Sequence, residues 1–364
     1  MKPRALMLTV AATLVGLGSN NVAASELYGM LRVRDLTPFG FLRLDMRPAY
    51  AIAIEPGQWA LETELGYQNT WALSPEVERY LTSLEPQGRR DLGPAEVQAI
   101  RDLPGENYLV DTELASLDIT LHYKFSQHWT GYVIASALSY DGGFLDSTIE
   151  EFHDTFGFST YGRPAAKRND VNLILDLKSS QAVLLDSPAE REFTDPTFGV
   201  RYVGLGLPDG WKLALEAAVK VPVSGRRLLV STGRTDVGFQ ASLLRFGQHH
   251  GFYLGASAVY YAGAAEPAPH DAQIIPTLLF GYERVLTERT NLNLQGYAST
   301  SVYSRDETDL KELLEEKYQL SLGFRHRREH VLISFAVTEN LQNINNTPDI
   351  GFQLGFTYLP DKPR

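Results

Sequence analysis

The chain of 364 residues contains no cysteine. This absence excludes disulfide bridges, thiolate metal sites, cysteine nucleophiles and a lipoprotein anchor. Long hydrophobic runs are also missing, because no stretch after residue 24 reaches the ~18 apolar residues that a membrane-spanning helix needs. The sequence has no glycine-rich phosphate loop and no Gly-x-Ser-x-Gly or His-Glu-x-x-His motif, so the enzyme classes that depend on them lack their signature here.

Positive charge is scarce as well. The sequence has 33 lysine and arginine residues against 44 aspartate and glutamate residues, a net charge of −11. An acidic surface repels a phosphate backbone, so we expect no nucleic-acid partner. We also predict no cofactor, because no cofactor-binding motif is present.

Residues 1–24 have the features of a signal peptide. Lys2 and Arg4 form a basic start, Ala5 to Leu17 form an apolar stretch that is too short to span a bilayer, and Val22-Ala23-Ala24 is a small-residue cleavage site. We predict export and cleavage after Ala24. The alternative is an N-terminal membrane anchor.

Apolar and polar residues alternate along about a dozen later segments. Trp59 and Leu61, for example, fall on one face of a predicted strand, while Glu62 and Glu64 fall on the other. The predicted strands are 58–70, 112–125, 129–140, 198–206, 211–222, 236–246, 251–261, 274–285, 290–302, 317–326, 330–338 and 349–358. Their length, and the aromatic residues near the turns, are typical of strands that cross a membrane.

The sequence therefore predicts an all-β, single-chain antiparallel transmembrane β-barrel of about 12 strands, within a range of 10–14. The charged faces should line the lumen, with Glu62, Glu64, Asp118, His122, Lys124, Glu216 and Lys220 as lumen-facing residues. The competing architecture is a soluble sandwich, in which these charged faces would meet solvent.

Short turns and long loops alternate between the strands. This parity places both termini in the periplasm, the long loops outside the cell and the barrel in the outer membrane, among its lipids. The last strand, with Phe352, Leu354, Phe356 and Tyr358 toward lipid and Gln353 and Thr357 toward the lumen, should pair with the strand near Trp59. We expect the barrel assembly machinery to recognise this last strand.

Two segments fall outside the twelve strands. We predict that residues 25–57 are periplasmic or packed within the lumen, ahead of a barrel domain at 58–360. We interpret residues 171–186 as an extracellular hairpin, because an even number of extra strands preserves the parity; if they spanned the membrane, the barrel would have fourteen strands.

Short helices are predicted in the long loops. Ser74 is a suitable N-cap, with Pro75 at the first helical position and an apolar stripe after it, and a second helix starts at Pro94. We expect these stripes to pack on the rim of the barrel, although the membrane surface or a partner would also accept them.

The loop from Gly142 to Gly157 holds the weak catalytic candidates. Ser147 and Glu150 have capping-box spacing, and Glu150 and Asp154 lie one helical turn apart beside His153. A histidine between carboxylates could act as a general base or metal ligand. We favour a structural role, because no third ligand or nucleophile stands at a fixed spacing, and we predict no metal site.

Several stretches resemble an uncharacterised family of Gram-negative outer-membrane β-barrel proteins, classed as a domain of unknown function. They are Tyr28 to Asp35, Gly142 to Ser147 with Ile149-Glu150 and Phe152-His153, Gly162-Arg163, and Glu339 to Leu341 with Asn346 to Phe352. The resemblance covers residues 26–360, implies a barrel in the outer membrane and transfers no catalytic residue. One departure is that Leu359 to Arg364 follow Tyr358, whereas such barrels usually end on an aromatic residue.

Three functions fit these features. We favour a narrow or plugged channel or transporter for a small solute or lipid-like molecule, because mixed charge on the inner face suggests inward ion pairs. The alternatives are an outer-membrane lipid-modifying enzyme, in which His153 would need Ser147, and a surface adhesion or structural barrel. We expect a protein without enzymatic activity.

Overall fold

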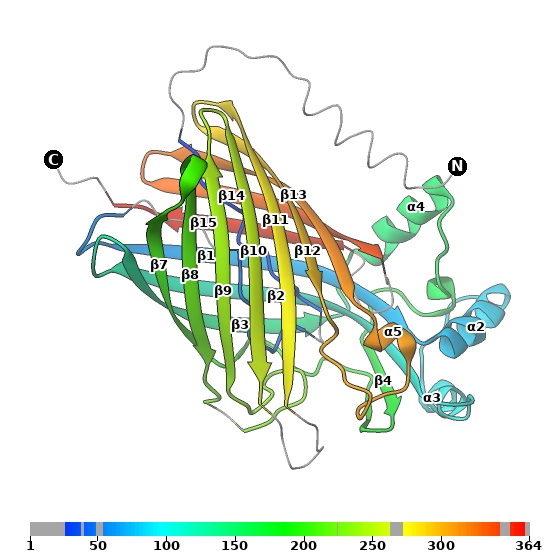
Figure 1. Cartoon of the computed structure of the whole chain (residues 1–364). Helices are drawn as coiled ribbons and strands as arrows, with labels where there is room; N and C mark the ends of the chain where they lie inside the picture. Colours follow the sequence, from blue (N-terminus) through cyan, green and yellow to red (C-terminus); the bar gives the residue numbers. More distant parts are fainter. Residues whose placement is uncertain are drawn as a thin grey trace.

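The computed structural model describes residues 26–37, 40–48, 54–223, 225–262, 272–342 and 350–360. The predicted signal peptide lies outside this part. Twelve strands form a closed antiparallel barrel, which confirms the predicted fold and strand number (Figure 1). They are β1 (Trp59–Leu73), β2 (Asn107–Lys124), β3 (Trp129–Asp141), β7 (Thr197–Gly206), β8 (Trp211–Lys220), β9 (Asp236–Phe246), β10 (His250–Tyr261), β11 (Gln273–Thr287), β12 (Thr290–Ser299), β13 (Lys317–Arg328), β14 (Val331–Gln342) and β15 (Ile350–Tyr358).

The barrel closes between its first and last strands. β15 pairs with β1 in a continuous register from Leu61 opposite Tyr358 to Asn69 opposite Ile350, and β1 pairs with β2 on its other side. Every strand of the wall thus has two neighbours, so the backbone groups find hydrogen-bond partners within the sheet. No helix of the described part is long and apolar enough to cross a membrane.

Alternation along the strands separates an apolar outer face from a polar inner face. On β11, Ile274 and Leu278 are 67% and 64% exposed, while Thr277 between them is buried. On β8, Leu215 is exposed and Glu216 is buried. A soluble protein hides its apolar face, so this inverted arrangement rules out the sandwich and matches a wall surrounded by lipid.

Three short strands lie outside the wall. β4 (Asn172–Leu177) and β5 (Ser180–Leu184) form a hairpin that pairs with β2 between Asn107 and Asp111, and β6 (Glu192–Phe193) pairs with β3. The hairpin interpretation of residues 171–186 is therefore confirmed, and a fourteen-strand wall is excluded.

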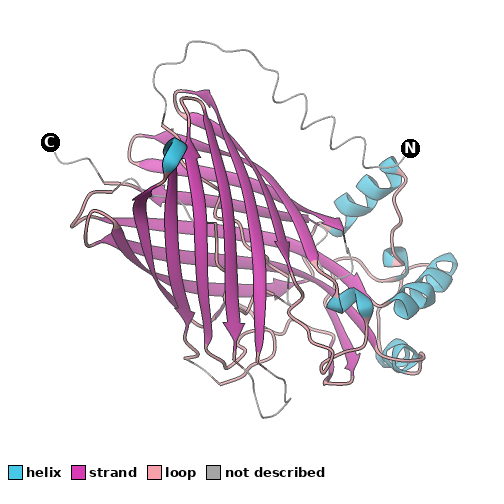
Figure 2. Cartoon of the chain, viewed as in Figure 1, coloured by secondary structure: helices cyan, strands magenta, loops and turns pink. Residues whose placement is uncertain are grey.

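Helices gather at the end of the barrel that carries the long loops, which we call the loop end; the opposite end is the turn end (Figure 2). They are α2 (Pro75–Leu84), α3 (Pro94–Arg101), α4 (Asp146–Phe156) and α5 (Lys311–Leu314), with 3-10 turns at Glu85–Gln87 and Arg163–Ala165. A third 3-10 turn, Pro208–Gly210, connects β7 to β8 at the turn end. Val77 and Leu81 of α2 and Val97 and Ile100 of α3 are buried in one cluster with Trp71. The predicted packing of these stripes on the rim is confirmed.

The predicted capping box of α4 is wrong. The helix begins at Asp146, one residue before Ser147, and Leu145 at its N-cap offers no side-chain hydrogen bond. Glu113 of β2 instead binds the backbone just before the helix, since its carboxylate accepts hydrogen bonds from the backbone N–H groups of Phe144 and Leu145, at 3.1 and 2.7 Å. The N–H of the N-cap residue Leu145 is the donor that the glutamate of a capping box would bind, so a carboxylate that is remote in sequence serves it here.

The described residues 26–37 and 40–48 run as two legs inside the barrel, here called the luminal hairpin (Figure 1). An outgoing leg ends at Thr37, whose carbonyl accepts hydrogen bonds from the N–H groups of Gly40 and Phe41. The returning leg runs back beside it, since Arg32 donates to the carbonyl of Pro48 at 2.8 Å. Its side chains pair with residues of β1, β2 and β13, and its backbone groups bond to side chains of β8, β11 and β12, so the wall surrounds it.

Glycines in the wall make room for apolar side chains of the luminal hairpin. A Cβ at Gly66 of β1 would lie 2.6 Å from Leu36 Cδ1, and Cβ atoms at three other glycines would meet hairpin side chains in the same way. The pairs are Gly66 with Leu36, Gly238 with Met46, Gly281 with Met30, and Gly323 with Leu31. The inner wall is thus shaped to fit the hairpin.

This fit predicts a position-specific effect of added methyl groups. Gly66→Ala should lower the free energy of unfolding by ~1–3 kcal/mol, because the new Cβ overlaps Leu36 and Ser116. Urea titration of the protein in lipid vesicles measures this. Gly296→Ala is the control, since nothing lies within 4 Å of a Cβ there. Equal unfolding midpoints for the two variants would contradict the fit, and Leu36→Ala should restore part of the loss in Gly66→Ala.

Candidate functional site

The polar interior of the barrel is the candidate site, and its centre is a set of buried ion pairs. Arg34 and Arg47 of the luminal hairpin both bind Asp118 of β2, with Arg34 at 3.2 Å. Arg47 also reaches Glu64 of β1 at 3.5 Å. Three predicted lumen positions on two strands, Glu62 and Glu64 of β1 and Asp118 of β2, thus place acids where hairpin arginines meet them. The paired groups are almost inaccessible to solvent.

A second group of contacts holds the luminal hairpin to the opposite wall. Lys317 of β13 binds Asp35 at 2.6 Å. Lys220 of β8 binds Asp236 at 3.1 Å and donates to the carbonyl of Leu42 at 2.7 Å. The hairpin therefore contributes both charge signs, and each meets its opposite on the wall.

Glu283 of β11 holds the start of the hairpin near the turn end. Its carboxylate accepts hydrogen bonds from the backbone N–H groups of Tyr28 and Gly29, at 2.7 and 3.0 Å. Asn291 donates to the same carboxylate at 2.6 Å, and Arg325 donates to the carbonyl of Tyr28, also at 2.6 Å. Because these wall side chains bind hairpin backbone atoms, they fix its path without requiring a particular hairpin residue.

His122 is sealed into the interior. It has no exposed surface, and its Nε2 lies 3.9 Å from Glu62, which also binds Arg32 at 3.4 Å. Neither ring nitrogen makes a hydrogen bond with the described residues, and the Tyr132 ring lies beside it. Without access for a substrate, His122 is poorly placed to act as a base.

The remaining predicted lumen residues also have structural partners. Glu216 accepts a hydrogen bond from Tyr132 at 2.6 Å and pairs with Arg201. Lys124 is half-buried at the turn end and donates to the carbonyl of Ile54 at 2.7 Å. The structure thus brings Glu62, Glu64, Asp118 and His122 together around the hairpin, with Glu216 beside them, and places Lys124 and Lys220 at the two ends of the lumen.

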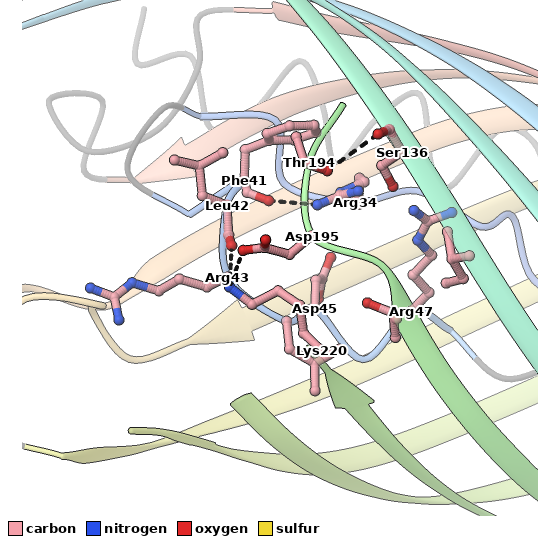
Figure 3. A pocket seen from close by; sticks show the side chains of 13 residues that line it. Arg34, Phe41, Leu42, Arg43, Asp45, Arg47, Ser136, Thr194, Asp195 and Lys220 are labelled. Atoms are coloured by element: carbon pink, nitrogen blue, oxygen red, sulfur yellow. Dashed lines mark hydrogen bonds and ion pairs between the residues drawn. The ribbon is translucent and has the colours of Figure 1, made fainter. Parts of the chain in front are cut away.

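Small cavities border the luminal hairpin. The one in Figure 3 has a volume of about 30 Å³ and is lined by Arg34, Asp45, Arg47, Asp195 and Lys220, among others. Two further cavities of about 20 Å³ also touch Asp45. Since a water molecule needs roughly 10–15 Å³, each cavity holds one or two waters and no larger solute.

Wider space occurs at the turn end. A vestibule of about 610 Å³ is lined by Arg289 and Glu288 from the β11–β12 turn, by Arg327 and Glu329 from the β13–β14 turn, and by Tyr28 of the hairpin. Tyr28 therefore stands where the vestibule meets the filled lumen.

The loop candidates are separated in the structure. Glu150 is buried and bound by Arg89 and Arg168, whereas Ser147 is exposed. His153 uses Nδ1 to bind the carbonyl of Ser159 at 2.7 Å, which ties the end of α4 to the next turn. Among the described residues no hydrogen bond joins Ser147 to His153, so the pair that a hydrolase needs is not assembled there. The same residues contain no cluster that could hold a metal ion.

The sequence reasoning missed the hairpin residues that complete the site. Arg32, Arg34, Arg43 and Arg47 lie within one short stretch of an otherwise acidic protein. Set against the acids on the inner strand faces, this basic stretch was the signal that could have placed it inside the lumen.

Comparison with known proteins agrees with the fold. Residues 103–359 match the family described as "Protein of unknown function (DUF3187)", so the chain belongs to this family and the expected resemblance is confirmed. No curated protein matches the chain.

Solved structures with a similar fold are outer-membrane proteins. The COG4313 outer membrane channel from Pseudomonas putida F1 is 10% identical, and the match covers 86% of this chain and 99% of that chain with a TM-score of 0.54. Looser matches are the P. putida toluene transporter TodX (8% identity, 85% and 91% covered, TM-score 0.39) and the translocator domain of autotransporter NalP from Neisseria meningitidis (6%, 84% and 90%, 0.43). The first match supports an outer-membrane barrel fold.

The contacts of Glu150 predict a pH-dependent anchor for α4. Burial raises its pKa, but the hydrogen bonds from Arg89 and Arg168 outweigh this and hold the pKa below the usual 4.5. The stability that the ionised carboxylate gives is therefore present above pH 4.5 and is lost as the pH falls through the lower folded pKa. The protection factors of residues 146–156, which compare the measured exchange with the intrinsic rate of each amide at the same pH, should be high at neutral pH and fall as the pH is taken below 4.5.

Two variants complete this test. Glu150→Gln should exchange fast already at neutral pH, while Glu151→Gln, at an exposed position of the same helix, should behave like the wild type. Slow exchange of α4 in Glu150→Gln at neutral pH would show that the two arginines do not anchor the helix.

Proposed function

We propose that this outer-membrane barrel is a channel for a small polar solute, and that its luminal hairpin holds it closed in the present state. The observation that carries the proposal is the way in which the hairpin fills the lumen. It leaves water-sized cavities beside it, although a vestibule of about 610 Å³ leads to it from the turn end.

The hairpin can leave without opening the wall. Its described residues form no strand and take part in no pairing of the sheet. They are held by side-chain ion pairs and by hydrogen bonds from wall side chains, as at Asp118 and Glu283. Its release would therefore leave the interstrand hydrogen bonds intact, which a segment woven into the sheet would not allow.

The exposed wall would suit a polar solute. Without the hairpin arginines, Glu62, Glu64 and Asp118 form an acidic stripe on β1 and β2, and Glu216 beside them stays paired with the basic Arg201. Such a surface attracts water and small cations and disfavours lipid-like cargo. The outer-membrane channel from P. putida with a similar fold is compatible with this function.

The proposal includes an orientation. As in bacterial barrels, we place the turn end, with the start of β1 and the end of β15, in the periplasm and the loop end outside the cell. Residues 1–24 would act as the signal peptide, residues 25–57 would fill the lumen from the periplasmic side, and the last strand of the 58–360 barrel would be recognised by the assembly machinery.

Planar-bilayer recording tests the channel. Wild-type protein should show small or rare conductance steps, whereas Arg34→Gln with Arg47→Gln should open more often, because the two substitutions remove the ion pairs to Asp118 and Glu64. The matched control is Arg79→Gln with Arg227→Gln, whose ion pairs lie in exposed loops. Folding of each variant is checked by heat-modifiable migration on gels.

A cross-link tests whether the hairpin itself is the gate. Because the chain has no cysteine, Leu36→Cys with Gly66→Cys introduces a single pair at a hairpin–wall contact. Added to the two arginine substitutions, the oxidised pair should suppress conductance and reduction should restore it. A second variant lacks residues 26–48 altogether. If this deletion variant and the double arginine variant both fold and neither conducts, the channel is ruled out.

A further inference from the structure

An exposed aromatic surface surrounds α4 at the loop end. It consists of Phe152, Phe156 and Phe158, here called the aromatic patch, which are 49%, 54% and 40% exposed, and Phe144, which is 64% exposed, precedes the helix. Phe152 contacts Phe156 and Phe158, with ring centroids 4.7 and 5.9 Å apart. Each ring carries a large apolar surface, so leaving several in water is unfavourable and marks an interaction surface.

The rest of the helix is anchored, which fixes the direction of the patch. Ile149 is buried, Asp146 binds Arg163, and Glu150 binds Arg89 and Arg168. After Gly157, which has a φ of 71°, the chain turns back so that Phe158 joins the rings on α4. The exposed acids Glu151 and Asp154 lie on the other flank of the helix, as its 3.6-residue period requires.

The start of α4 is joined to the lipid-facing wall through Phe144. Phe144 stacks on Tyr67, with centroids 5.1 Å apart, and Tyr67 shares the outer face of β1 with the exposed Leu61 and Leu65. Tyr67 also lines a largely apolar groove of about 280 Å³ over the seam between β15, β1 and β2, together with Leu65, Phe335, Phe352 and Leu354. In Figure 1, α4 projects from the loop end, apart from α2 and α3.

We propose that α4 is an interfacial membrane helix, whose aromatic patch inserts into the lipid leaflet next to the loop end. Aromatic rings favour this depth, and an amphipathic helix lies there with its apolar side buried by roughly 5–10 Å. The occupant is lipid, because Phe144 at the start of the helix stacks on Tyr67, which lies on the outer face of a transmembrane wall. The inference rests on the membrane location of the barrel. It goes beyond the proposed channel function, and recordings that rule out the channel would leave it standing.

Single-site labelling tests this insertion. The cysteine-free chain allows one cysteine at a time, at Phe156, at Phe152, at Glu151 as the matched control on the same helix, and at Leu65 as the lipid-facing reference. Each is labelled with an environment-sensitive fluorophore in phosphatidylcholine nanodiscs that hold one protein copy. Heat-modifiable migration confirms that each variant is folded.

If the patch inserts, the labels at positions 156 and 152 should be quenched by lipid-borne quenchers, as the label at position 65 is. Lipids with a doxyl group near the head of the acyl chain should quench the label at 156 and 152 at least about twofold more than at 151, and aqueous iodide should show the reverse order. Equal iodide quenching at 156 and 151 would overturn the proposal. Protection from both quenchers would overturn it too, because the patch would then be covered by protein.

Discussion

The shared ion pair at Asp118 is the interaction on which the interior depends. Asp118 lies on the inner face of β2, where two hairpin arginines, Arg34 and Arg47, neutralise it. A buried carboxylate without partners is strongly unfavourable, and breaking such a pair by removing one side typically costs ~3–5 kcal/mol. In the closed state the acids of the wall therefore depend on the hairpin for their neutralisation, and the arginines of the hairpin equally depend on the acids of the wall. Apolar side chains of the hairpin fit the wall in the same mutual way, because Gly66 and Gly281 leave the space that Leu36 and Met30 fill.

Two kinds of bonding give the protein two levels of stability. The wall is a cooperative ladder that closes from β15 to β1, and opening it would leave backbone groups unpaired in lipid. The luminal hairpin is attached by side chains, and those at its turn, such as Phe41, reach the loop-end cluster with Leu114 and Tyr140. A unit attached in this way can detach locally at less cost than global unfolding, which is the property that a gate needs.

The sequence was sufficient for the wall because each strand carries its own evidence. Period-two alternation at β1 or β8 identifies the strand and its inner face without knowledge of its neighbours, and the alternation of short turns with long loops gives the count. The same parity identified residues 171–186 as a hairpin outside the wall. The capping box predicted from the local sequence at Ser147 was wrong. Glu113, which is remote in sequence, binds the backbone N–H groups at the start of α4 instead.

The luminal hairpin was harder to place for the same reason. Its legs lack periodicity, and their partners, such as Glu283 and Lys317, lie more than 250 positions away in sequence. The arginines of the segment were the only feature that favoured a position inside the barrel, and charge alone does not distinguish a lumen from solvent. Glu150 and His153 were catalytic candidates because their residue types are common in active sites. In the structure both hold α4 in place, Glu150 through Arg89 and Arg168 and His153 through the carbonyl of Ser159.

Strand number and hairpin are linked by the width of the barrel. Eight strands enclose a space that side chains alone can fill, whereas 16–18 strands leave an aqueous channel. Twelve strands fall between these cases, so the inner side chains do not meet across the lumen and a two-legged segment supplies the missing volume. The charges on the two legs are opposite to those on the wall, so the lumen is filled by this particular segment. A water-filled lumen of this width would leave Glu62, Glu64 and Asp118 hydrated and accessible. The closed and open states of the proposed channel thus differ in what neutralises the same three acids, arginine in one and water with small cations in the other.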